Sequence, residues 1–423
     1  MLTIYRCFIN IFFPLIVIII FLRVIFNKED KLRFKEKLFF SSFNIVKKFR
    51  RKLIWFHVAS IGELKSIIPL IKKLKEDNNF DFLITTVTVS SAQLFNKEFS
   101  LQDNITHRFF PIDKPSLIKK FLEGWKPNLT IFVDSEIWPN FLFEIKKRKI
   151  PLILLNARIT KKTFQRWNLF PTLAKSVFNN FDLCLASSNE SKKYLKKMNT
   201  NKIKYFGNLK LTAESKIKDL NVENIKIINT QKTWCAVSTH EGEDIFCLKT
   251  HLEIRKNFED IVTIIIPRHI NRVVKIKSEC KKMNLKSQIL SEGELIKRGK
   301  EIIIINSYGV MSKYLNICKS VFIGKSLIKK LEPVGGQNPI EAAKLGCKIY
   351  HGPYVNNFKE IYELLNQYKI SEKINEVSEL SHKLTTDLMG SKKINNEKII
   401  FINNLGKKIL NDTYKELSEI LYQ

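Results

Sequence analysis

Paired cysteines, acidic residues and arginines are all scarce in this 423-residue sequence. Its seven cysteines form no Cys-x-x-Cys pair and have no metal-ligand spacing with histidine. Scattered thiols of odd number are typical of a reducing compartment, so we predict neither disulfides nor a structural zinc site. The chain also lacks an internal repeat and a low-complexity segment, which argues against solenoids and propellers.

The charge balance points to a membrane surface. Acidic residues number 41 against 72 lysines and arginines, a formal net charge of +31. Only 13 of the 72 basic residues are arginine, whose planar guanidinium is the preferred group for nucleic-acid recognition, and no nucleic-acid-binding motif accompanies them. We therefore expect an anionic membrane as the partner and no nucleic acid. A basic, membrane-tethered nucleic-acid-binding module is kept as an alternative.

The longest apolar run lies at residues 7–26. Its length is close to the roughly 17 to 25 residues that a transmembrane helix needs, so residues 1–27 are expected to form a membrane anchor that crosses once or inserts deeply. A cleaved signal peptide is the rival, but Arg23 and Lys28 follow the run in place of a small-x-small site. Basic residues are dense between positions 28 and 52, which predicts a cytoplasmic location for the rest of the chain.

Behind the anchor, strand-like runs alternate with helical patterns. The candidate strands are 53–59, 82–88, 130–134, 151–155, 181–186, 203–206, 233–237, 261–266, 301–305, 319–323 and 347–350. This alternation predicts βα units and parallel sheets. The length exceeds what one core usually supports, and a polar stretch near 212–230 marks a junction. We expect two doubly wound, Rossmann-like α/β domains that face a cleft, 28–215 and 216–423, whose last helix could return to the N-terminal domain.

The segment 54–64 runs an apolar strand directly into a Ser-x-Gly-Glu turn. Gly62 permits a tight turn, and Glu63 falls in the first turn of the next helix, where the helix dipole favours its ionised form. Ligands of open α/β sheets bind beyond the carboxyl ends of the strands, which places Glu63 well for chemistry. Ser60 and Glu63 also match a capping box that would only satisfy backbone amides. The residues leave both interpretations open.

Two more polar clusters follow apolar runs in the N-terminal half. Segment 134–140 holds two carboxylates, Asp134 and Glu136, with a Trp and an Asn. These groups could bind polyhydroxylated material by hydrogen bonds and ring stacking, although Pro139 also suits an ordinary helix start. Asn156 and Arg158 add an amide and a cation at another strand end.

The C-terminal half carries groups that suit an anion. Ser238, Thr239 and His240 follow the run 233–237 and precede a helical pattern, so their hydroxyls and backbone amides could bind a negative charge. Arg268 and His269 follow the run 261–266, and a guanidinium there could hold a phosphate or carboxylate in bidentate fashion. A basic surface turn is the alternative for this second pair.

The segment Gly335-Gly336-Gln337-Asn338 is the most specific motif. Two glycines could bring the backbone close to a ligand, and the helix start at Pro339 attracts negative charge. Glu341 could accept hydrogen bonds from ribose hydroxyls. The spacing matches neither a P-loop nor Gly-x-Gly-x-x-Gly, which argues against ATPases and dehydrogenases.

Together these motifs resemble those of the 3-deoxy-D-manno-octulosonic acid (Kdo) transferases of lipopolysaccharide synthesis. The resemblance covers nearly the whole chain and rests on segments 59–63, 136–140, 156–158, 207–210, 238–240, 267–269, 335–338, 352–353 and 357–358. It implies a glycosyltransferase-B fold and an inverting transfer of Kdo from CMP-Kdo to a lipid A precursor, lipid IVA. The implied location is the cytoplasmic face of the inner membrane, with no metal or other cofactor.

The resemblance also assigns residues. Glu63 would be the general base and Glu136 a supporting carboxylate. The residues implied in substrate binding are Ser60, Gly62, Asn156, Arg158, Lys210, Ser238, Thr239, His240, Arg268, His269, Gly335, Gly336, Gln337, Asn338 and Glu341. Of these, the CMP site would fall on Ser238, Thr239, Arg268, Gly336, Asn338 and Glu341.

Three positions depart from the family pattern. Asp134 stands where a Glu is usual, Gln337 where a His is frequent, and segment 306–311 lacks both acids of the family's Asp-Thr-x-Gly-Glu-Leu. These departures leave the role of segment 306–311 open. Another nucleotide-sugar transferase of similar fold, acting on a different lipid or glycan, is the alternative function.

Overall fold

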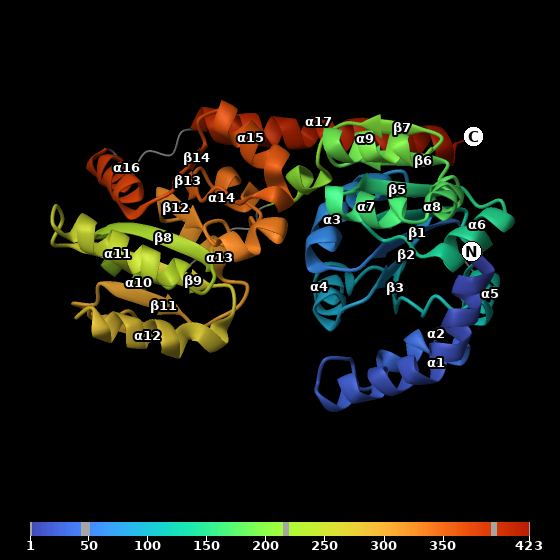
Figure 1. Cartoon of the computed structure of the whole chain (residues 1–423), viewed down its shortest axis with the longest axis horizontal. Helices are drawn as coiled ribbons and strands as arrows, with labels where there is room; N and C mark the ends of the chain where they lie inside the picture. Colours follow the sequence, from blue (N-terminus) through green and yellow to red (C-terminus); the bar gives the residue numbers. More distant parts are fainter. Residues whose placement is uncertain (1, 44–50, 215–219, 391–395, 423) are drawn as a thin grey trace. The chain divides into compact units, whose positions relative to one another are not determined.

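The protein is built from two α/β units, each around a seven-stranded parallel sheet (Figure 1). The computed structural model describes residues 2–43, 51–214, 220–390 and 396–422. Unit 1 comprises residues 1–214 and 406–423, and unit 2 comprises residues 215–405. The predicted class of two doubly wound, Rossmann-like sheets is confirmed.

The sheet of unit 1 has the strand order β3-β2-β1-β4-β5-β6-β7. Its strands are β1 (Lys52–Val58), β2 (Phe80–Thr86), β3 (Ile105–Phe109), β4 (Leu129–Val133), β5 (Leu152–Ala157), β6 (Leu183–Ala186) and β7 (Ile203–Tyr205). Its helices are α1 (Leu2–Ile25), η1 (Arg33–Lys37), α2 (Phe40–Phe43), α3 (Ile61–Lys75), α4 (Val89–Phe99), α5 (Pro115–Trp125), α6 (Pro139–Lys147), α7 (Lys161–Asn168), α8 (Pro171–Phe178), α9 (Asn189–Lys197) and η2 (Leu209–Thr212).

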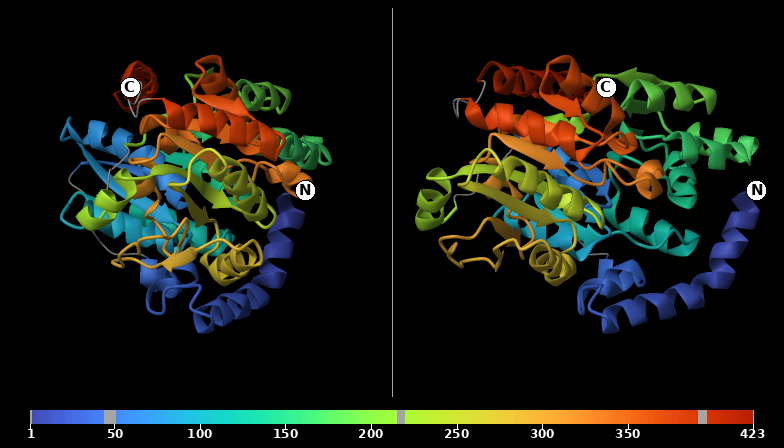
Figure 2. Two further views of the ribbon diagram at one scale, coloured as in Figure 1. Left: turned by 90° about the vertical axis from the view of Figure 1, so that its left-hand side faces the viewer. Right: turned by 60° about the vertical axis from the view of Figure 1, so that its left-hand side comes forward.

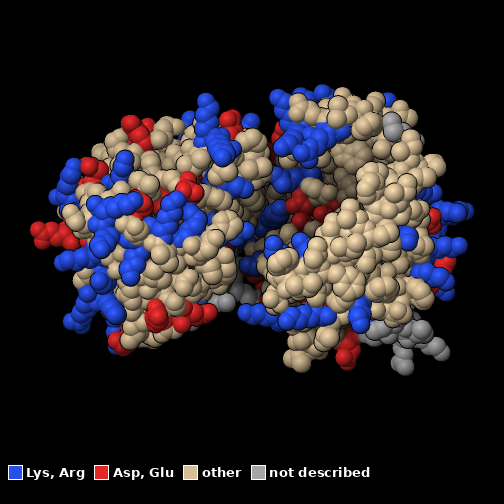
Figure 3. Space-filling view, turned by 60° about the horizontal axis from the view of Figure 1, so that its bottom comes forward, with Lys and Arg blue, Asp and Glu red and all other residues tan. Residues whose placement is uncertain are grey.

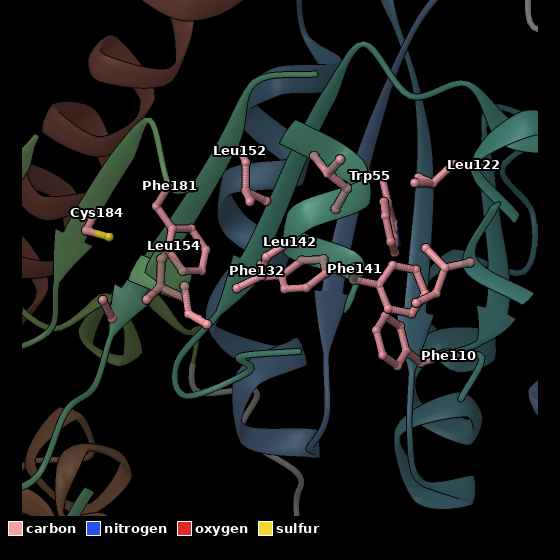
Figure 4. Packing of buried hydrophobic residues seen from close by; sticks show 14 of the residues in the cluster. Trp55, Phe110, Leu122, Phe132, Phe141, Leu142, Leu152, Leu154, Phe181 and Cys184 are labelled. Carbon is pink, nitrogen blue, oxygen red and sulfur yellow. The ribbon is translucent and has the colours of Figure 1, made fainter. Parts of the chain in front are cut away.

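An aromatic core holds unit 1 together on one side of its sheet (Figure 4). Trp55 of β1 is fully buried and packs against Phe121 of α5 and Phe141 of α6, with ring centroids 4.9 and 5.7 Å apart. Side chains of this size bury a large apolar area, so the core holds β1 and β4 against α5 and α6. The polar side chains that follow those strands are thereby held on a rigid base.

The sheet of unit 2 has the order β10-β11-β9-β8-β12-β13-β14. Its strands are β8 (Lys232–Thr239), β9 (Ile261–Pro267), β10 (Ser287–Leu290), β11 (Ile302–Ile305), β12 (Ser320–Ile323), β13 (Lys348–His351) and β14 (Ser371–Lys373). Its helices are α10 (Val222–Asn229), α11 (Glu243–Arg255), η3 (Ile270–Arg272), α12 (Val273–Lys282), α13 (Met311–Leu315), η4 (Lys329–Val334), α14 (Ile340–Lys344), η5 (Asn356–Phe358), α15 (Lys359–Gln367) and α16 (Val377–Met389).

Three strands that the sequence analysis did not assign, β3, β10 and β14, complete the sheets. All three lie at sheet edges. In β3, Thr106 and Arg108 alternate with buried residues, so the strand lacks the continuous apolar run of a central parallel strand. Edge strands of this kind are invisible to a search for apolar runs.

The last helix, α17 (Asn396–Leu421), begins in unit 2 and ends on unit 1. A side chain at Gly406 would meet the carbonyl oxygen of Leu211 at 2.4 Å, so glycine is required where the helix passes this backbone. Further along, the Tyr414 hydroxyl donates to Asp77 Oδ2 at 2.9 Å. The chain therefore connects the two units a second time.

Candidate active site

The two sheets place the motifs at their topological switch points, where the strand order reverses. In unit 1 this point lies between β1 and β4, and in unit 2 between β8 and β12. Ligands of open α/β sheets bind outside the carboxyl ends of the strands at such points. Glu63 follows β1 and Asp134 follows β4, whereas His240 follows β8 and Lys325 follows β12. The fold thus gathers motifs that are far apart in sequence into one cluster per unit.

Glu63 is held at the start of α3 by its neighbours. Ser60 is the N-cap, and its hydroxyl oxygen accepts from the Glu63 amide at 3.3 Å. The Ser60 hydroxyl donates to Glu63 Oε1 at 2.8 Å, and the Ala59 amide donates to Oε2 at 2.7 Å. A capping arrangement therefore exists and fixes the carboxyl group in place, so the two interpretations of this motif are compatible.

The tight turn expected at Gly62 is not present. Gly62 lies inside the first turn of α3 without a positive φ. A side chain there would meet only the Ser60 hydroxyl, at 3.9 Å. The glycine therefore leaves open space beside Glu63 and does not serve a backbone turn.

The pKa of Glu63 is higher than we expected from its place at the helix N-terminus. Burial, followed by the negative charge of Asp134, raises its pKa to about 7, although the hydrogen bonds from Ala59 and Ser60 oppose this. The expectation that its ionised form is favoured is wrong, because removal from water outweighs the dipole. A carboxyl group with a pKa near the working pH is well suited to accept a proton during a reaction.

Asp134 and Asn156 occupy strained positions at the ends of β4 and β5. Both have left-handed backbones, with φ of 63° and 52°, a conformation that is uncommon outside glycine and often marks functional sites. Asp134 Oδ2 accepts from Lys210 Nζ at 2.7 Å, and Asn156 Oδ1 accepts from the Leu209 amide at 2.8 Å. Asp134 Oδ1 and Asn156 Nδ2 are buried and have no hydrogen-bond partner among the described residues. A bound ligand could supply one.

Arg158 joins this cluster through its backbone. Its amide donates to the Asp134 carbonyl oxygen at 3.0 Å, and the Ser135 hydroxyl donates to the Arg158 carbonyl oxygen at 3.0 Å. The structure therefore brings together the acid of the Ser-x-Gly-Glu turn, the end of β4, the end of β5 and Lys210 of η2.

Glu136 differs from Glu63 in its environment. Its Oε2 accepts from Trp138 Nε1 at 2.9 Å and lies 3.2 Å from His57 Nε2. Burial raises the pKa of Glu136, but these two neighbours outweigh it, so the net pKa is below the ordinary value. Trp138 also packs against Phe110, with ring centroids 5.5 Å apart. The Trp that we expected to stack on a ligand is instead engaged within the protein.

His57 was not identified from the sequence. It is the second-to-last residue of β1, within an apolar run, and is fully buried. A histidine at a core position of a strand near polar strand ends was the only available signal. Its partner on another strand could not be inferred from sequence.

In unit 2, a buried carboxylate connects the loops after β8 and β12. Glu243 is fully buried and accepts four backbone hydrogen bonds. The donors are the amides of His240 (2.8 Å), Lys325 (2.6 Å), Ser326 (2.8 Å) and Leu327 (3.0 Å). Sequence analysis did not single out Glu243, because three of its four donors lie more than eighty residues away in the chain.

Positive charge surrounds His240. Burial, followed by the charges of Lys325, His269, Arg272 and Arg268, lowers the pKa of His240 to about 4. His240 Nε2 and Thr239 Oγ1 are buried and have no hydrogen-bond partner among the described residues. A neutral imidazole and a hydroxyl within a cationic environment can bind an anionic ligand such as a phosphate.

The cations of this cluster are not equivalent. Arg272 is paired with Asp244 and also donates to the Thr239 carbonyl oxygen at 3.1 Å. It therefore stabilises the protein itself. Arg268 is exposed, and its amide donates to the same Thr239 oxygen at 3.1 Å. Its place beside β8 and its exposure leave its guanidinium accessible to a ligand.

The Gly335-Gly336 segment lies close to the backbone of Tyr354 and Val355. A side chain at Gly335 would meet the Tyr354 carbonyl oxygen at 2.4 Å, and one at Gly336 would meet Val355 Cα at 2.9 Å. The close approach that we expected toward a ligand is thus made to the loop after β13. The Gly336 amide donates to the Lys325 carbonyl oxygen at 2.6 Å, which links this segment to the cationic cluster.

The helix after this segment is short. α14 has five residues, so its dipole contributes less to anion binding than we expected. Asn338 Oδ1 accepts from the Ile340 amide at 3.0 Å, and the Gln337 carbonyl oxygen accepts from the Tyr362 hydroxyl at 2.9 Å. Glu341 lies half-buried in the first turn. Among the described residues, no group of three His, Cys, Asp or Glu side chains could hold a metal ion.

Solved structures with the same fold include an epimerase of a nucleotide sugar and a glycosyltransferase. A putative UDP-N-acetylglucosamine 2-epimerase from Listeria monocytogenes matches with a TM-score of 0.60 at 14% identity, covering 87% of this chain and 97% of the other. A glycosyltransferase from Rickettsia africae matches with a TM-score of 0.59 at 13% identity, covering 88% and 99%. These likenesses concern the fold alone and agree with the expected glycosyltransferase-B type.

Sequence comparisons are more specific. The family model described as 3-deoxy-D-manno-octulosonic-acid transferase (kdotransferase) matches residues 32–213. The probable mitochondrial 3-deoxy-D-manno-octulosonic acid transferase of Arabidopsis thaliana is 30% identical over 87% of this chain and 82% of its own length. The 3-deoxy-D-manno-octulosonic acid transferase of Haemophilus influenzae is 26% identical over 87% and 85%. The chain belongs to the 3-deoxy-D-manno-octulosonic acid transferase family of glycosyltransferases.

Proposed function

We propose that this protein is an inverting glycosyltransferase that transfers Kdo from CMP-Kdo to lipid IVA at the cytoplasmic face of the inner membrane. Family membership supports Kdo transfer in lipopolysaccharide synthesis. The observation that carries the proposal is the contrast between the two switch points. Unit 1 presents a carboxyl group with a pKa of about 7, and unit 2 presents a cationic cluster suited to a phosphate.

In the proposed reaction, Glu63 acts as the general base. Its carboxylate takes the proton from an acceptor hydroxyl while that oxygen forms a bond to the anomeric carbon of Kdo. The bond from this carbon to the phosphate oxygen breaks, and its electron pair leaves with CMP. Attack on the face opposite the leaving group inverts the anomeric centre. Proton transfer of this kind contributes roughly 10²- to 10⁴-fold to a rate.

Around this base we assign supporting roles in unit 1. The pKa of Glu136 is lowered, so this carboxylate stays ionised and does not take the proton. Its negative charge helps to raise the pKa of Glu63. We propose that Asp134 Oδ1 and Asn156 Nδ2, which lack partners among the described residues, hydrogen-bond to substrate hydroxyls. The remaining residues proposed to bind substrate in unit 1 are Ser60, Gly62, Arg158 and Lys210.

In unit 2 we propose the site of CMP-Kdo. Arg268 and Lys325 would stabilise the phosphate as negative charge develops on it, and Thr239 and His240 offer hydrogen-bonding atoms that are unpartnered among the described residues. Charge-assisted hydrogen bonds to phosphate are the strongest contacts available to such groups. The remaining proposed donor-binding residues are Ser238, His269, Gly335, Gly336, Gln337, Asn338 and Glu341.

The membrane location rests on α1. Among the described residues, α1 alone is long and apolar enough to cross a membrane, with a mean hydropathy of 2.7. We propose that α1 attaches the protein to the inner membrane, where the lipid acceptor would lie, with both units cytoplasmic. A single crossing and an insertion in the membrane plane both satisfy this proposal.

A transfer assay tests the function. Full-length protein is incubated with a tetra-acylated lipid A precursor and either CMP-Kdo or a set of UDP-sugars, and the lipid products are weighed by mass spectrometry. We expect a mass gain of one or more Kdo units with CMP-Kdo only, together with release of CMP. A product formed only from a UDP-sugar would replace this proposal by the alternative of another nucleotide-sugar transferase.

A further inference from the structure

Helix α1 contacts the rest of unit 1 at both of its ends. Near its start, the Tyr5 hydroxyl donates to Asp113 Oδ2 at 2.8 Å, and Arg6 Nε donates to Asn140 Oδ1 at 3.1 Å. Near its end, Ile20 is buried, and Ile20 and Val24 pack in a cluster around η1. The helix therefore lies against the unit at its first and at its last turns.

The middle of α1 is attached as well. Phe13 packs against the aromatic core of unit 1, and Lys114 Nζ lies 3.7 Å from the centroid of its ring. Ile16 and Val17 join the cluster around η1. The contacts of α1 with the rest of unit 1 thus extend from Tyr5 to Val24.

The opposite side of α1 is an uninterrupted apolar stripe. Its members recur every three or four residues, which is the spacing of one helix face. They are Ile4, Phe8, Ile11, Leu15, Ile18 and Leu22, with exposed fractions of 70, 56, 72, 50, 55 and 47%. Exposing such a stripe, which contains no polar residue, to water is energetically unfavourable.

The helix is bent, and the bend suits the surface of the unit. Both views in Figure 2 show α1 changing direction partway along its length. Pro14 lies inside the helix and removes one backbone hydrogen bond, which is a common cause of kinks. The bend lets a helix of 24 residues keep contact with unit 1.

Exposed apolar and basic residues also follow α1 in the sequence. Leu32, Phe39 and Phe40 are exposed by 83, 44 and 54%. The lysines at positions 28, 31 and 35 are also exposed. Figure 3, which turns the lower side of Figure 1 forward, shows a broad area without charge on the right, with basic residues at its borders. Exposed apolar groups bordered by lysines fit the interface of a membrane that contains anionic lipids.

We propose that α1 lies in the plane of the membrane, still packed against unit 1, and inserts its apolar stripe into one leaflet without crossing the bilayer. The proposal rests on the membrane attachment stated above and specifies its form. It places unit 1 directly on the leaflet that would hold the acceptor.

A crossing helix is incompatible with the contacts. A helix that leaves a cytoplasmic unit to span the bilayer can touch that unit near one end only, because about 30 Å of hydrocarbon must surround the rest. Crossing would separate Tyr5 from Asp113, which is only 2% exposed and also accepts from the Asn140 and Phe141 amides. A buried carboxyl group would lose one of its partners.

Depth measurements by spin labelling test this inference. Single cysteines replace Ile4, Ile11 or Ile18 in a Cys7→Ser background; the other six cysteines are buried. The full-length variants are labelled with a nitroxide and reconstituted into vesicles of phosphatidylethanolamine and phosphatidylglycerol. Collision rates with oxygen and with a water-soluble nickel complex then give the depth of each label. A Lys97→Cys variant on the exposed side of α4 is the matched control in water.

We expect all three labels at one shallow depth, about 5 to 10 Å below the headgroups. For a crossing helix, labels seven residues apart would differ by about 10 Å, with one near the bilayer centre. That second pattern overturns the in-plane insertion but leaves membrane attachment and Kdo transfer intact. Labels that all behave like the Lys97→Cys control would overturn membrane attachment itself. The transfer assay in the same vesicles tests the enzymatic function separately.

Discussion

The two units share a fold but have opposite chemistry at their switch points. In unit 1, carboxyl groups gather: Glu63 follows β1, and Asp134 and Glu136 follow β4. In unit 2, the corresponding position holds Glu243, whose carboxylate is used entirely by backbone amides, and cations surround the neighbouring His240. A carboxyl group after the first strand is therefore not sufficient to predict its function.

The carboxyl groups of Glu63 and Glu243 differ in their hydrogen-bond partners. The Glu63 carboxyl group accepts from one backbone amide and from the Ser60 hydroxyl, whereas the Glu243 carboxylate accepts from four backbone amides. Burial and nearby negative charge raise the pKa of Glu63 to about 7. The first carboxyl group can exchange a proton with a substrate, and the second holds two loops together. The following substitutions test this division, from the largest expected effect to the smallest.

Replacement of Glu63 should have the largest effect on catalysis. Glu63→Gln keeps the size of the side chain but removes its basicity, so we expect kcat to fall by roughly 10²- to 10⁴-fold. Turnover of CMP-Kdo is measured under saturating acceptor. Glu76→Gln, an exposed change at the other end of α3, is the control and should be neutral. Near-normal turnover in Glu63→Gln would remove this residue from the mechanism.

Replacement of Arg268 should weaken the donor site without affecting the base. A hydrogen bond to a charged group is worth about 1.5 to 3 kcal/mol, so Arg268→Gln should raise KM for CMP-Kdo by about 10- to 100-fold. Steady-state kinetics at varied donor concentration measures this. Arg298→Gln, another exposed arginine of unit 2, controls for loss of general positive charge. Equal effects of the two changes would contradict a specific role for Arg268.

Replacement of Glu243 should lower the stability of the protein more than it changes the rate of transfer. Glu243→Gln exchanges one accepting oxygen for an NH₂ group that faces backbone donors, which should cost about 1 to 3 kcal/mol of folding free energy. Differential scanning calorimetry should show a lower transition temperature. Glu241→Gln, two residues earlier and fully exposed, should leave the transition unchanged. A stable Glu243→Gln protein would show that the loops hold without this carboxylate.

The smallest predicted effect is a shift of the pH profile on replacement of Asp134, measured apart from any loss of substrate binding. The base must be deprotonated, so with a pKa of about 7 for Glu63, activity should rise as the pH increases through this value. Asp134→Asn removes a charge that raises this pKa, so the acidic limb of kcat/KM should move to lower pH, by on the order of one unit or less. Asp260→Asn, exposed in unit 2, is the control. If the acidic limb of the kcat/KM profile does not move in Asp134→Asn, a group other than Glu63 produces that limb.

Sequence alone predicted the parts of this molecule that depend on local pattern. Apolar runs located the central strands, and polar residues directly after them located Glu63, Asp134 and His240 at strand ends. The edge strands β3, β10 and β14 were missed because they lack continuous apolar runs. Their pairing is decided by the neighbouring strand.

Properties that depend on the folded environment were not predictable. The raised pKa of Glu63 requires burial and the proximity of Asp134, 71 residues later in the chain. The partners of Glu243 and the approach of Gly335 to Tyr354 also come from separate segments. Residue types thus indicated where chemistry could occur, while tertiary contacts decided which carboxyl group can react.

Binding of CMP to three full-length proteins tests the division between the units most directly. Isothermal titration calorimetry compares the native protein with Glu63→Gln and Arg268→Gln. Our account predicts that Glu63→Gln binds CMP as the native protein does, whereas Arg268→Gln binds it about 10-fold more weakly or worse. Loss of CMP binding in Glu63→Gln with unchanged binding in Arg268→Gln would contradict the assignment of the nucleotide to unit 2.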